Sequence, residues 1–224
     1  GLQYHYEWIQ GLSVDDIGKN GISSVYLNNL EEGTAEGGTI THQWFKDLHA
    51  AAKDGQPKVI CTQPGTPIKC GGAPQKILYL SDDYLKRDGL TADFTFATNG
   101  GKLFGAVPAV DETLRSEVQP RYGNITNKFK HNLVSIDVEN KVATFEHNYE
   151  VQGSYDEDLE EYEMIAKREL VEMEYDFIHI VPPMSAPTRP SLRRGCTRPE
   201  SMSSMTSSSS CRISRSLMVP APFF

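Results

Sequence analysis

The sequence predicts an α/β fold: a Rossmann-like half domain of three layers, with a parallel sheet and a β-hairpin insertion. Between residues 58 and 131, short apolar runs alternate with segments of helical spacing in the order strand, helix, strand, helix, strand. Glycine-rich turns separate these segments. Two further runs alternate apolar and polar residues around Glu139-Asn140, which is the pattern of a hairpin.

The first strand and helix of this order have clear signals. The apolar run Lys58 to Thr62 predicts a short strand. Residues 70–89 predict a turn followed by a helix, and Gly89 is a natural residue to end it. The helical spacing places three apolar residues on one face, with two leucines beside it: Ile77, Leu80 and Tyr84, then Leu78 and Leu85.

The second half of the order is equally regular. Residues 93–97 predict the next strand, which Asn99-Gly100-Gly101 ends. Residues 107–122 predict a second helix, with Pro108 in its first turn. Its expected apolar face consists of Val110, Leu114 and Val118. Residues 126–131 predict the third strand, and residues 134–138 and 141–147 predict the hairpin.

Weaker patterns precede and follow this unit. Thr39 or Thr41 is expected to cap a helix through Trp44 and Leu48. The segment from Glu150 to Glu174 is strongly acidic, which predicts a solvated insertion or hairpin arm, with a docking surface for a basic partner as the alternative. Residues 176–181 then predict a buried strand that ends at the prolines before Met184.

The charge of the chain is distributed unevenly. Its net charge is −8, but residues 1–184 hold 29 acids against 16 Lys and Arg, while residues 185–224 hold one acid and six Arg. The acidic body argues against a nucleic-acid partner. No run of about 18 apolar residues predicts a membrane-spanning helix. The tail 188–224 shows no helical or strand period and is expected to be disordered, or a frameshifted segment without a selected function.

The cysteines point to a reactive thiol. Four cysteines in 224 residues are too few and too scattered for a disulfide framework, and no pair has the spacing of a zinc site, so no metal is predicted. Cys196 and Cys211 fall in the tail and are not expected to be sites. Cys61 lies inside the predicted strand and is expected to be a buried structural thiol. Cys70 lies on the following turn, where a dinucleotide-binding domain would carry Gly-x-Gly-x-x-Gly, a pattern this sequence lacks.

Six histidines form no metal spacing. His179 alternates within an apolar run and is expected to be a core residue with satisfied hydrogen bonds. His42 and His49 are expected on the surface of a helix. None of the histidines is predicted to be catalytic.

The run Pro67-Ile-Lys-Cys-Gly-Gly-Ala-Pro-Gln-Lys76 resembles the catalytic segment of sulfide:quinone oxidoreductases, FAD-dependent flavoproteins of the pyridine nucleotide-disulfide oxidoreductase superfamily. Residues 1–4, 18–26, 103–105 and 177–187 are similar to other stretches of that family, in the same order. The resemblance therefore covers about residues 1–187 and implies a central fragment.

The resemblance implies a chemistry. In this family sulfide is oxidised by a cysteine pair beside FAD, one sulfur passes to an acceptor, and two electrons reach a membrane quinone. Cys70 matches a redox cysteine, and its position before a helix, near Lys69 and Lys76, favours a thiolate. Gly1 and Pro183 match positions near the cofactor. The implied location is peripheral, on the bacterial or mitochondrial inner membrane, through a C-terminal part that this sequence lacks.

The resemblance also implies a division of the chain. Residues 1–57 would be a partial flavin-domain and linker segment, and 58–150 the second Rossmann-like domain with the Cys70 turn. Residues 151–187 would be the acidic insertion and the strand returning to the flavin domain, before the irregular tail 188–224. The second redox cysteine and the main FAD motifs are absent, so the fragment alone is expected to be inactive. Two alternatives stay open: another two-domain flavoprotein, of the NADH:quinone or flavocytochrome-c sulfide dehydrogenase type, or a non-catalytic half-domain remnant.

Overall fold

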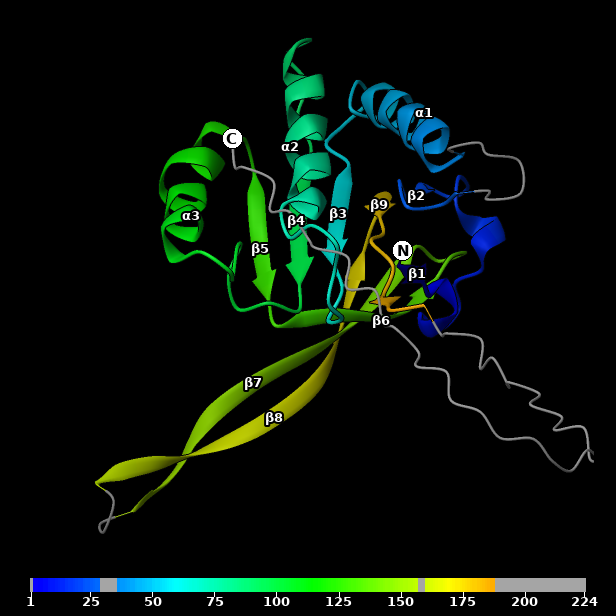
Figure 1. Cartoon of the computed structure of the whole chain (residues 1–224). Helices are drawn as coiled ribbons and strands as arrows, with labels where there is room; N and C mark the ends of the chain where they lie inside the picture. Colours follow the sequence, from blue (N-terminus) through cyan, green and yellow to red (C-terminus); the bar gives the residue numbers. More distant parts are fainter. Residues whose placement is uncertain (1, 29–35, 157–159, 188–224) are drawn as a thin grey trace, which may run out of the picture. The chain divides into compact units, whose positions relative to one another are not determined.

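A five-stranded parallel sheet forms the centre of the computed structural model, which describes residues 2–28, 36–156 and 160–187 (Figure 1). The outer strand β2 pairs with β9, followed by β3, β4 and β5. The strand bounds in this spatial order are Ile22–Ser23, Phe177–His179, Lys58–Gln63, Asp93–Thr98 and Ile125–Phe129. The predicted parallel α/β sheet is therefore confirmed, and β2 and β9 extend it from the two ends of the described chain.

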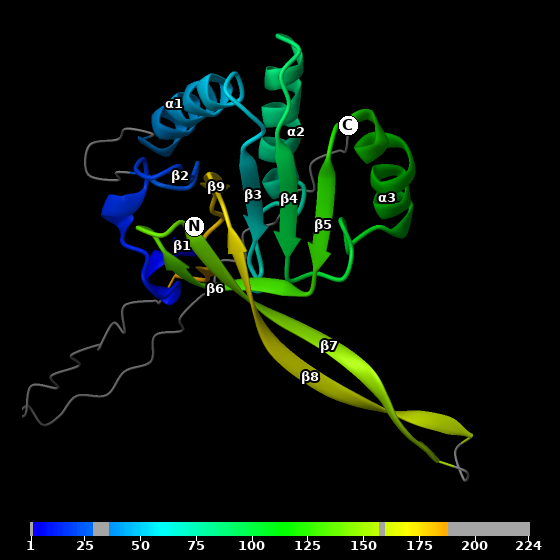
Figure 2. The same cartoon turned by 180° about the vertical axis from the view of Figure 1, so that it is seen from behind.

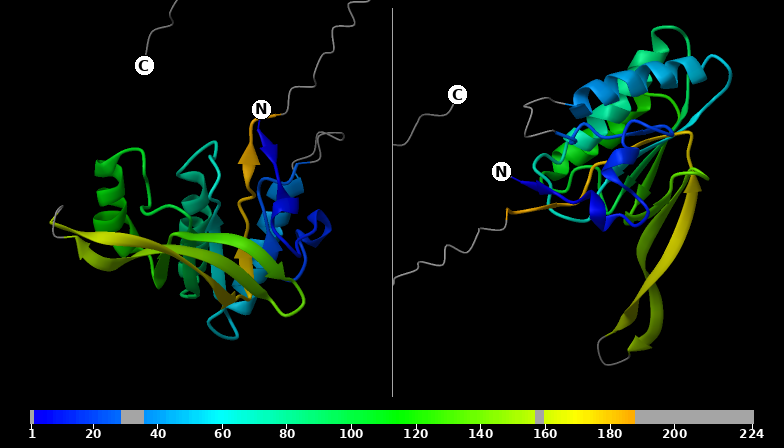
Figure 3. Two further views of the ribbon diagram at one scale, coloured as in Figure 1. Left: turned by 90° about the horizontal axis from the view of Figure 1, so that it is seen from below. Right: turned by 90° about the vertical axis from the view of Figure 1, so that its right-hand side faces the viewer.

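Alternation along β3 directs its side chains into two different cores. Val59 and Cys61 pack with α1 (Glu36–Ala51) and α2 (Ala73–Lys86) on one face of the sheet. Ile60 packs on the other face with side chains from an antiparallel sheet, β6–β7–β8. Figure 3 shows the helices on one side of the parallel sheet and the antiparallel sheet on the other. The three layers are thus helices, parallel sheet and antiparallel sheet.

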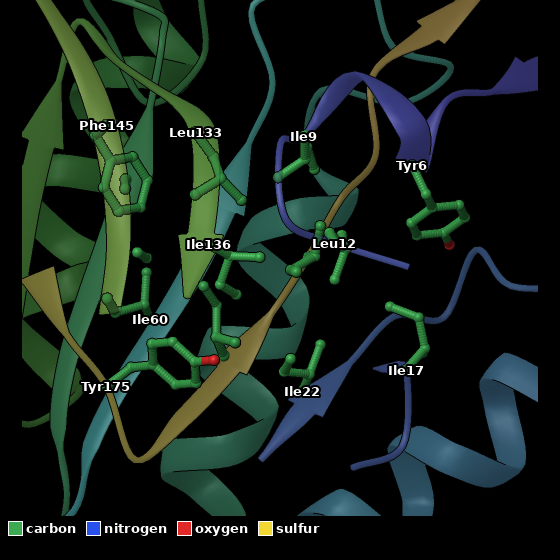
Figure 4. Packing of buried hydrophobic residues seen from close by; sticks show 14 residues of the cluster. Tyr6, Ile9, Leu12, Ile17, Ile22, Ile60, Leu133, Ile136, Phe145 and Tyr175 are labelled. Atoms are coloured by element: carbon green, nitrogen blue, oxygen red, sulfur yellow. The ribbon is translucent and has the colours of Figure 1, made fainter. Parts of the chain in front are cut away.

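The second core joins distant segments of the chain (Figure 4). Tyr6, Ile9 and Leu12 come from the N-terminal segment, and Ile136 and Phe145 come from the antiparallel sheet. All five are buried. At one edge, β1 (Gln3–Tyr4) pairs antiparallel with β10 (Met184–Ser185), which ties the first described residues to the last.

The burial of α2 differs from the predicted face. Leu78 and Leu85 are fully buried, whereas Leu80 is 55% exposed. The buried stripe runs through Leu78, Ser81, Asp82 and Leu85, because the helix faces both the sheet and α1. The prediction that placed Leu80 on the packed face was wrong. Gly89 adopts a positive φ of 71°, so the predicted end of the helix is confirmed.

The second predicted helix is less regular than its sequence indicates. It begins as α3 (Pro108–Thr113), continues as a π-helical turn at Leu114–Val118, and ends as a 3₁₀ turn at Gln119–Arg121. Leu114 packs against the core as predicted, whereas Val110 is 40% exposed and Asp111 is the buried residue of α3, so the predicted apolar face is wrong at Val110. Asp111 is buried because its carboxylate accepts hydrogen bonds from the Phe104 N–H and the Arg115 guanidinium.

The helix α1 begins earlier than the proposed caps. It starts at Glu36, so Thr39 and Thr41 lie inside it, and the buried Thr41 hydroxyl has no partner among the described residues. The expectation of a Thr39 or Thr41 cap was therefore wrong. Trp44 and Leu48 are buried as predicted.

The acidic segment forms a long hairpin arm. The strands β6 (His131–Asp137), β7 (Val142–Asp156) and β8 (Glu161–Glu174) form the antiparallel sheet, and the predicted hairpin around Glu139-Asn140 is confirmed. Beyond β6, the ribbon of β7 and β8 extends away from the parallel sheet (Figures 1 and 2). The prediction of a solvated hairpin arm is confirmed. The predicted third strand ends at Phe129, and His131 instead begins β6.

Candidate functional site

The turn Pro64–Gly72 connects the carboxyl end of β3 with α2 and presents an exposed, free cysteine, Cys70. The second cysteine in this part of the chain, Cys61, lies in the middle of β3 and is fully buried. Burial raises the pKa of the Cys61 thiol to about 12. Cys61 is therefore a structural thiol, as predicted, and Cys70 is the thiol that a small molecule can reach.

Two hydrogen bonds from other elements hold the first half of the turn. The Gly65 N–H donates to Asn132 Oδ1 of β6 at 2.9 Å. The Met184 N–H of β10 donates to Thr66 Oγ1 at 2.8 Å. A β-carbon on Gly65 would lie 2.9 Å from Asn99 Nδ2, so a side chain at this position would require Asn99 to move. The turn is thus fixed to both the antiparallel sheet and the β1–β10 ribbon.

The second half of the turn is held by the start of α2. The Ala73 N–H donates to the Cys70 carbonyl at 3.1 Å, and Gly72 is the N-cap residue. The Gln75 amide donates to the Leu103 carbonyl at 2.5 Å, which joins α2 to the loop after β4. A β-carbon on Gly71 would lie 3.4 Å from the Phe104 ring. Cys70 therefore lies two residues before the N-cap of α2, and hydrogen bonds hold the backbone on both sides of it.

A hollow of about 510 Å³ lies beside the turn. It is bounded by the ends of β3 and β4, and Gly71 is the residue of the Cys70 turn that lines it. The other lining residues are Gln63, Gly100, Gly101, Lys102, Leu103, Phe104, Gly105 and Ala106. Parallel α/β sheets bind ligands outside the carboxyl ends of their strands, and this hollow has that location. Cys70 itself does not line it.

Two tyrosines of the N-terminal segment contact each other, and one of them, Tyr26, lies near the turn. The rings of Tyr4 and Tyr26 meet edge to face with centroids 5.6 Å apart. The pKa of Tyr26 is raised, mainly by burial, then by the neighbouring Tyr4 and Cys70. Tyr26 is thus within electrostatic reach of Cys70, a proximity that no sequence pattern indicated.

The other candidate residues have different positions. Lys69 and Lys76 are exposed on either side of Cys70. Pro183 is half-buried and its carbonyl accepts a hydrogen bond from the His5 N–H at 2.9 Å. Gly1, Cys196 and Cys211 lie outside the described residues. Lys69 precedes Cys70 in the turn, and Lys76 lies in the first turn of α2.

His179 is a core residue, but its hydrogen bonds are incomplete. It is fully buried in β9, and its Nε2 accepts a hydrogen bond from the Val25 N–H at 3.2 Å. Its Nδ1 has no partner among the described residues, so the expectation of a satisfied histidine was wrong in this respect. Burial lowers the pKa of His179 to about 3 and keeps the ring neutral. His42 is exposed as predicted, while His49 is half-buried and contacts Asp88 at 2.6 Å.

Sequence reasoning found Cys70 and missed the residues that position it. Thr66 carried a weak signal, because a threonine between Gly65 and Pro67 is a common turn residue. Asn132 and Phe104 carried none, since their contacts with the turn depend on the packing of β6 and of the loop after β4.

Comparison with known proteins relates this arrangement to one group of enzymes. The chain is 34% identical over 186 residues to the mitochondrial sulfide:quinone oxidoreductase of Dictyostelium discoideum, a match that covers 82% of this chain and 33% of that protein. It is 31% identical over 190 residues to the mouse mitochondrial sulfide:quinone oxidoreductase, covering 84% of this chain and 35% of that protein. The chain is related to the sulfide:quinone oxidoreductases. The resemblance found in the sequence is thereby confirmed.

The solved structure of the sulfide:quinone oxidoreductase of Aquifex aeolicus has the same fold. It matches with a TM-score of 0.56 at 18% identity, over 84% of this chain and 35% of that one. No family model matches the chain. The chain spans about a third of the length of the sulfide:quinone oxidoreductases that it matches.

Proposed function

We propose that this chain supplies the sulfur-handling turn of a sulfide:quinone oxidoreductase, with Cys70 as one of its two redox cysteines. The observation that carries the proposal is the exposed thiol of Cys70 on a turn anchored by β6, β10 and the start of α2. Two relatives bear the name of this activity over most of the chain's length.

The proposed chemistry needs a thiol that alternates between a disulfide and a thiolate. Hydrosulfide adds to one sulfur of the disulfide between Cys70 and a second cysteine, which forms a persulfide on one residue and releases a thiolate on the other. A nucleophilic acceptor then takes the outer sulfur and leaves two thiolates. Their return to the disulfide releases two electrons, which finally reduce a quinone. Cys61 cannot be the second cysteine, because it is fully buried in the middle of β3.

FAD is the electron carrier that the proposal implies, and the described residues fit only a small part of such a cofactor. When bound, FAD would accept the two electrons. Pro183 has no N–H, so it offers a flavin the apolar contact of its ring and no backbone donor. The sequence contains no Gly-x-Gly-x-x-Gly turn for the pyrophosphate. FAD is therefore proposed from the relatives.

We further propose a peripheral position on the membrane that contains the quinone. For relatives named mitochondrial, this would be the mitochondrial inner membrane, and for a bacterial protein the inner membrane. Among the described residues, no helix combines the length and apolar character needed to cross a membrane.

A chimera tests the proposed function. This chain would replace the matching 186-residue segment of the Dictyostelium relative, and sulfide-dependent quinone reduction would be measured. The chimera is expected to be active, Cys70→Ser to lose activity by at least about a thousandfold, and Cys61→Ser to stay within a few-fold of the parent. Activity that survives in Cys70→Ser would refute the role of this thiol.

A further inference from the structure

The hairpin arm is unusual because its outer part is exposed on every side. Every residue from Glu160 to Leu170 is exposed, and β8 has no strand on its outer edge in the described chain. A two-stranded ribbon is marginally stable by itself in water. The arm nevertheless keeps a continuous register from Val142↔Glu174 to Gln152↔Met164. The exposure of the arm and its regular strand pairing together indicate that another molecule covers its surface.

One face of the arm gathers large apolar side chains. Alternate residues of a strand point to the same side, so Tyr162, Met164 and Leu170 share a face of β8. Tyr155 of β7 joins them, because it pairs with Tyr162 and their rings meet at 5.0 Å. These four side chains are 50–65% exposed. We call this set the apolar face of the arm. Tyr155, Tyr162 and Met164 are neighbours near the end of the arm, and Leu170 lies six residues along β8 from Met164, beyond Ala166 and Arg168. Single exposed apolar residues are ordinary, but a cluster of three on one face is typical of an interaction site.

Acidic side chains lie among and beyond the apolar residues of this face. Residues 142–155 and 160–174 hold eight Glu against two Lys or Arg. Arg168, on the same face, is neutralised by Glu146 at 2.5 Å. Glu150, which pairs in register with Ala166, and Glu172, two residues beyond Leu170, are exposed on this face. Among the described residues, neither has an ion-pair partner. Because Ala166 lies between Met164 and Leu170, Glu150 places negative charge beside the apolar side chains, and Glu172 places it beyond Leu170.

These charges decide between the possible occupants. A second copy of the chain would bring Glu150 and Glu172 of two arms together, and like charges oppose such a contact. An anionic lipid surface is disfavoured for the same reason. We propose that the apolar face of the arm docks a basic, partly apolar polypeptide segment of a partner, whose Lys or Arg side chains meet Glu150 and Glu172.

A designed peptide tests this recognition on the full chain. The probe is the fluorescein-labelled octapeptide Leu-Val-Leu-Val-Lys-Lys-Lys-Lys, with one apolar half for the cluster near the end of the arm and one basic half for Glu150 and Glu172. We expect saturable binding by fluorescence anisotropy that weakens at least tenfold in the double variant Met164→Ser/Leu170→Ser. The double variant Glu150→Gln/Glu172→Gln should weaken it to a similar extent and reduce its dependence on salt. The matched control is Ile165→Ser, since Ile165 is 42% exposed on the opposite face of β8 and its loss should leave binding unchanged.

Three outcomes would overturn the proposal. Equal binding of Ser-Ser-Ser-Ser-Lys-Lys-Lys-Lys would show charge attraction without an apolar site. Equal binding of Leu-Val-Leu-Val-Glu-Glu-Glu-Glu would show apolar adhesion without a contribution from the acidic side chains. A dimer in sedimentation that Met164→Ser/Leu170→Ser dissociates would show that the face binds a second copy. Unchanged thermal midpoints of the variants would confirm that the fold is intact, as expected for exposed positions.

Discussion

Cys61 and Cys70 lie nine residues apart in one strand-turn segment, yet their surroundings are opposite. Cys61 is in the middle of β3, between the helices and the sheet, and no part of it is exposed. Cys70 is beyond the end of the strand, on an exposed turn that backbone and side-chain hydrogen bonds hold in place. The difference shows that side chains inside this sheet stabilise the fold. Residues beyond its carboxyl edge can react with solutes, because they are exposed on a turn that hydrogen bonds hold in place.

Alkylation should separate the two thiols by the largest factor. At pH 8 a thiol of pKa about 12 is ionised to roughly one part in ten thousand, and burial further blocks Cys61. We expect iodoacetamide to modify Cys70 at least about a thousandfold faster than Cys61, measured by peptide mass spectrometry. In guanidinium chloride the two rates should converge. Comparable rates in the native chain would contradict the contrast between the two sites.

Truncation of a helix residue should distinguish the buried face of α2 from its exposed face. Leu78 packs in the same core as Cys61, so Leu78→Ala should lower the free energy of unfolding by about 3 kcal/mol. Leu80 is exposed, and Leu80→Ala should change it by less than about 0.5 kcal/mol. Urea unfolding of both variants measures the difference. Equal losses of unfolding free energy would show that Leu80 is packed, as the sequence predicted.

Acidification should weaken the buried core through His179. The pKa of this ring is about 3 in the folded chain and about 6.5 when unfolded, so below pH 6.5 the unfolded chain binds a proton that the folded chain excludes. Stability is therefore complete above pH 6.5 and is lost as the pH falls, on the order of 1 kcal/mol per unit. We expect urea unfolding at pH 5 to show a loss of about 2 kcal/mol relative to pH 7.

The variant His179→Gln isolates this contribution. It should flatten the dependence between pH 7 and pH 5, although burial also lowers the pKa of His131 and leaves a smaller slope of the same sign. An unchanged slope in His179→Gln would assign the effect to other groups.

Loss of the Thr66 hydrogen bond that anchors the Cys70 turn should lower stability less than the loss of a core side chain. Thr66→Val leaves the Met184 N–H without its acceptor, which should cost about 1 kcal/mol. Thr66→Ser keeps the hydroxyl and serves as the matched control. Hydrogen exchange of the Met184 amide should accelerate at least severalfold in Thr66→Val and stay near the parent rate in Thr66→Ser. Unchanged exchange in Thr66→Val would show that β10 does not hold the turn.

The sequence predicted the order of elements and the location of Cys70, because both depend on local signals. Apolar runs, glycine turns and the motif from Pro67 to Lys76 are all readable within a few residues. The packed face of α2 could not be predicted from the sequence, because Ile77, Leu78 and Leu80 are equally apolar. The neighbouring sheet decides which of them is buried. The anchors Asn132 and Met184 were equally hidden, since their bonds to the turn join residues far apart in the chain.

The central claim is that sulfide chemistry takes place at Cys70, and the reductive half-reaction tests it most directly. In the chimera with the Dictyostelium relative, stopped-flow mixing with sulfide in the absence of quinone should bleach the flavin absorbance in the parent and in Cys61→Ser. In Cys70→Ser the rate should fall by at least about a thousandfold, while the bound flavin content stays unchanged. Rapid bleaching in Cys70→Ser would contradict the claim.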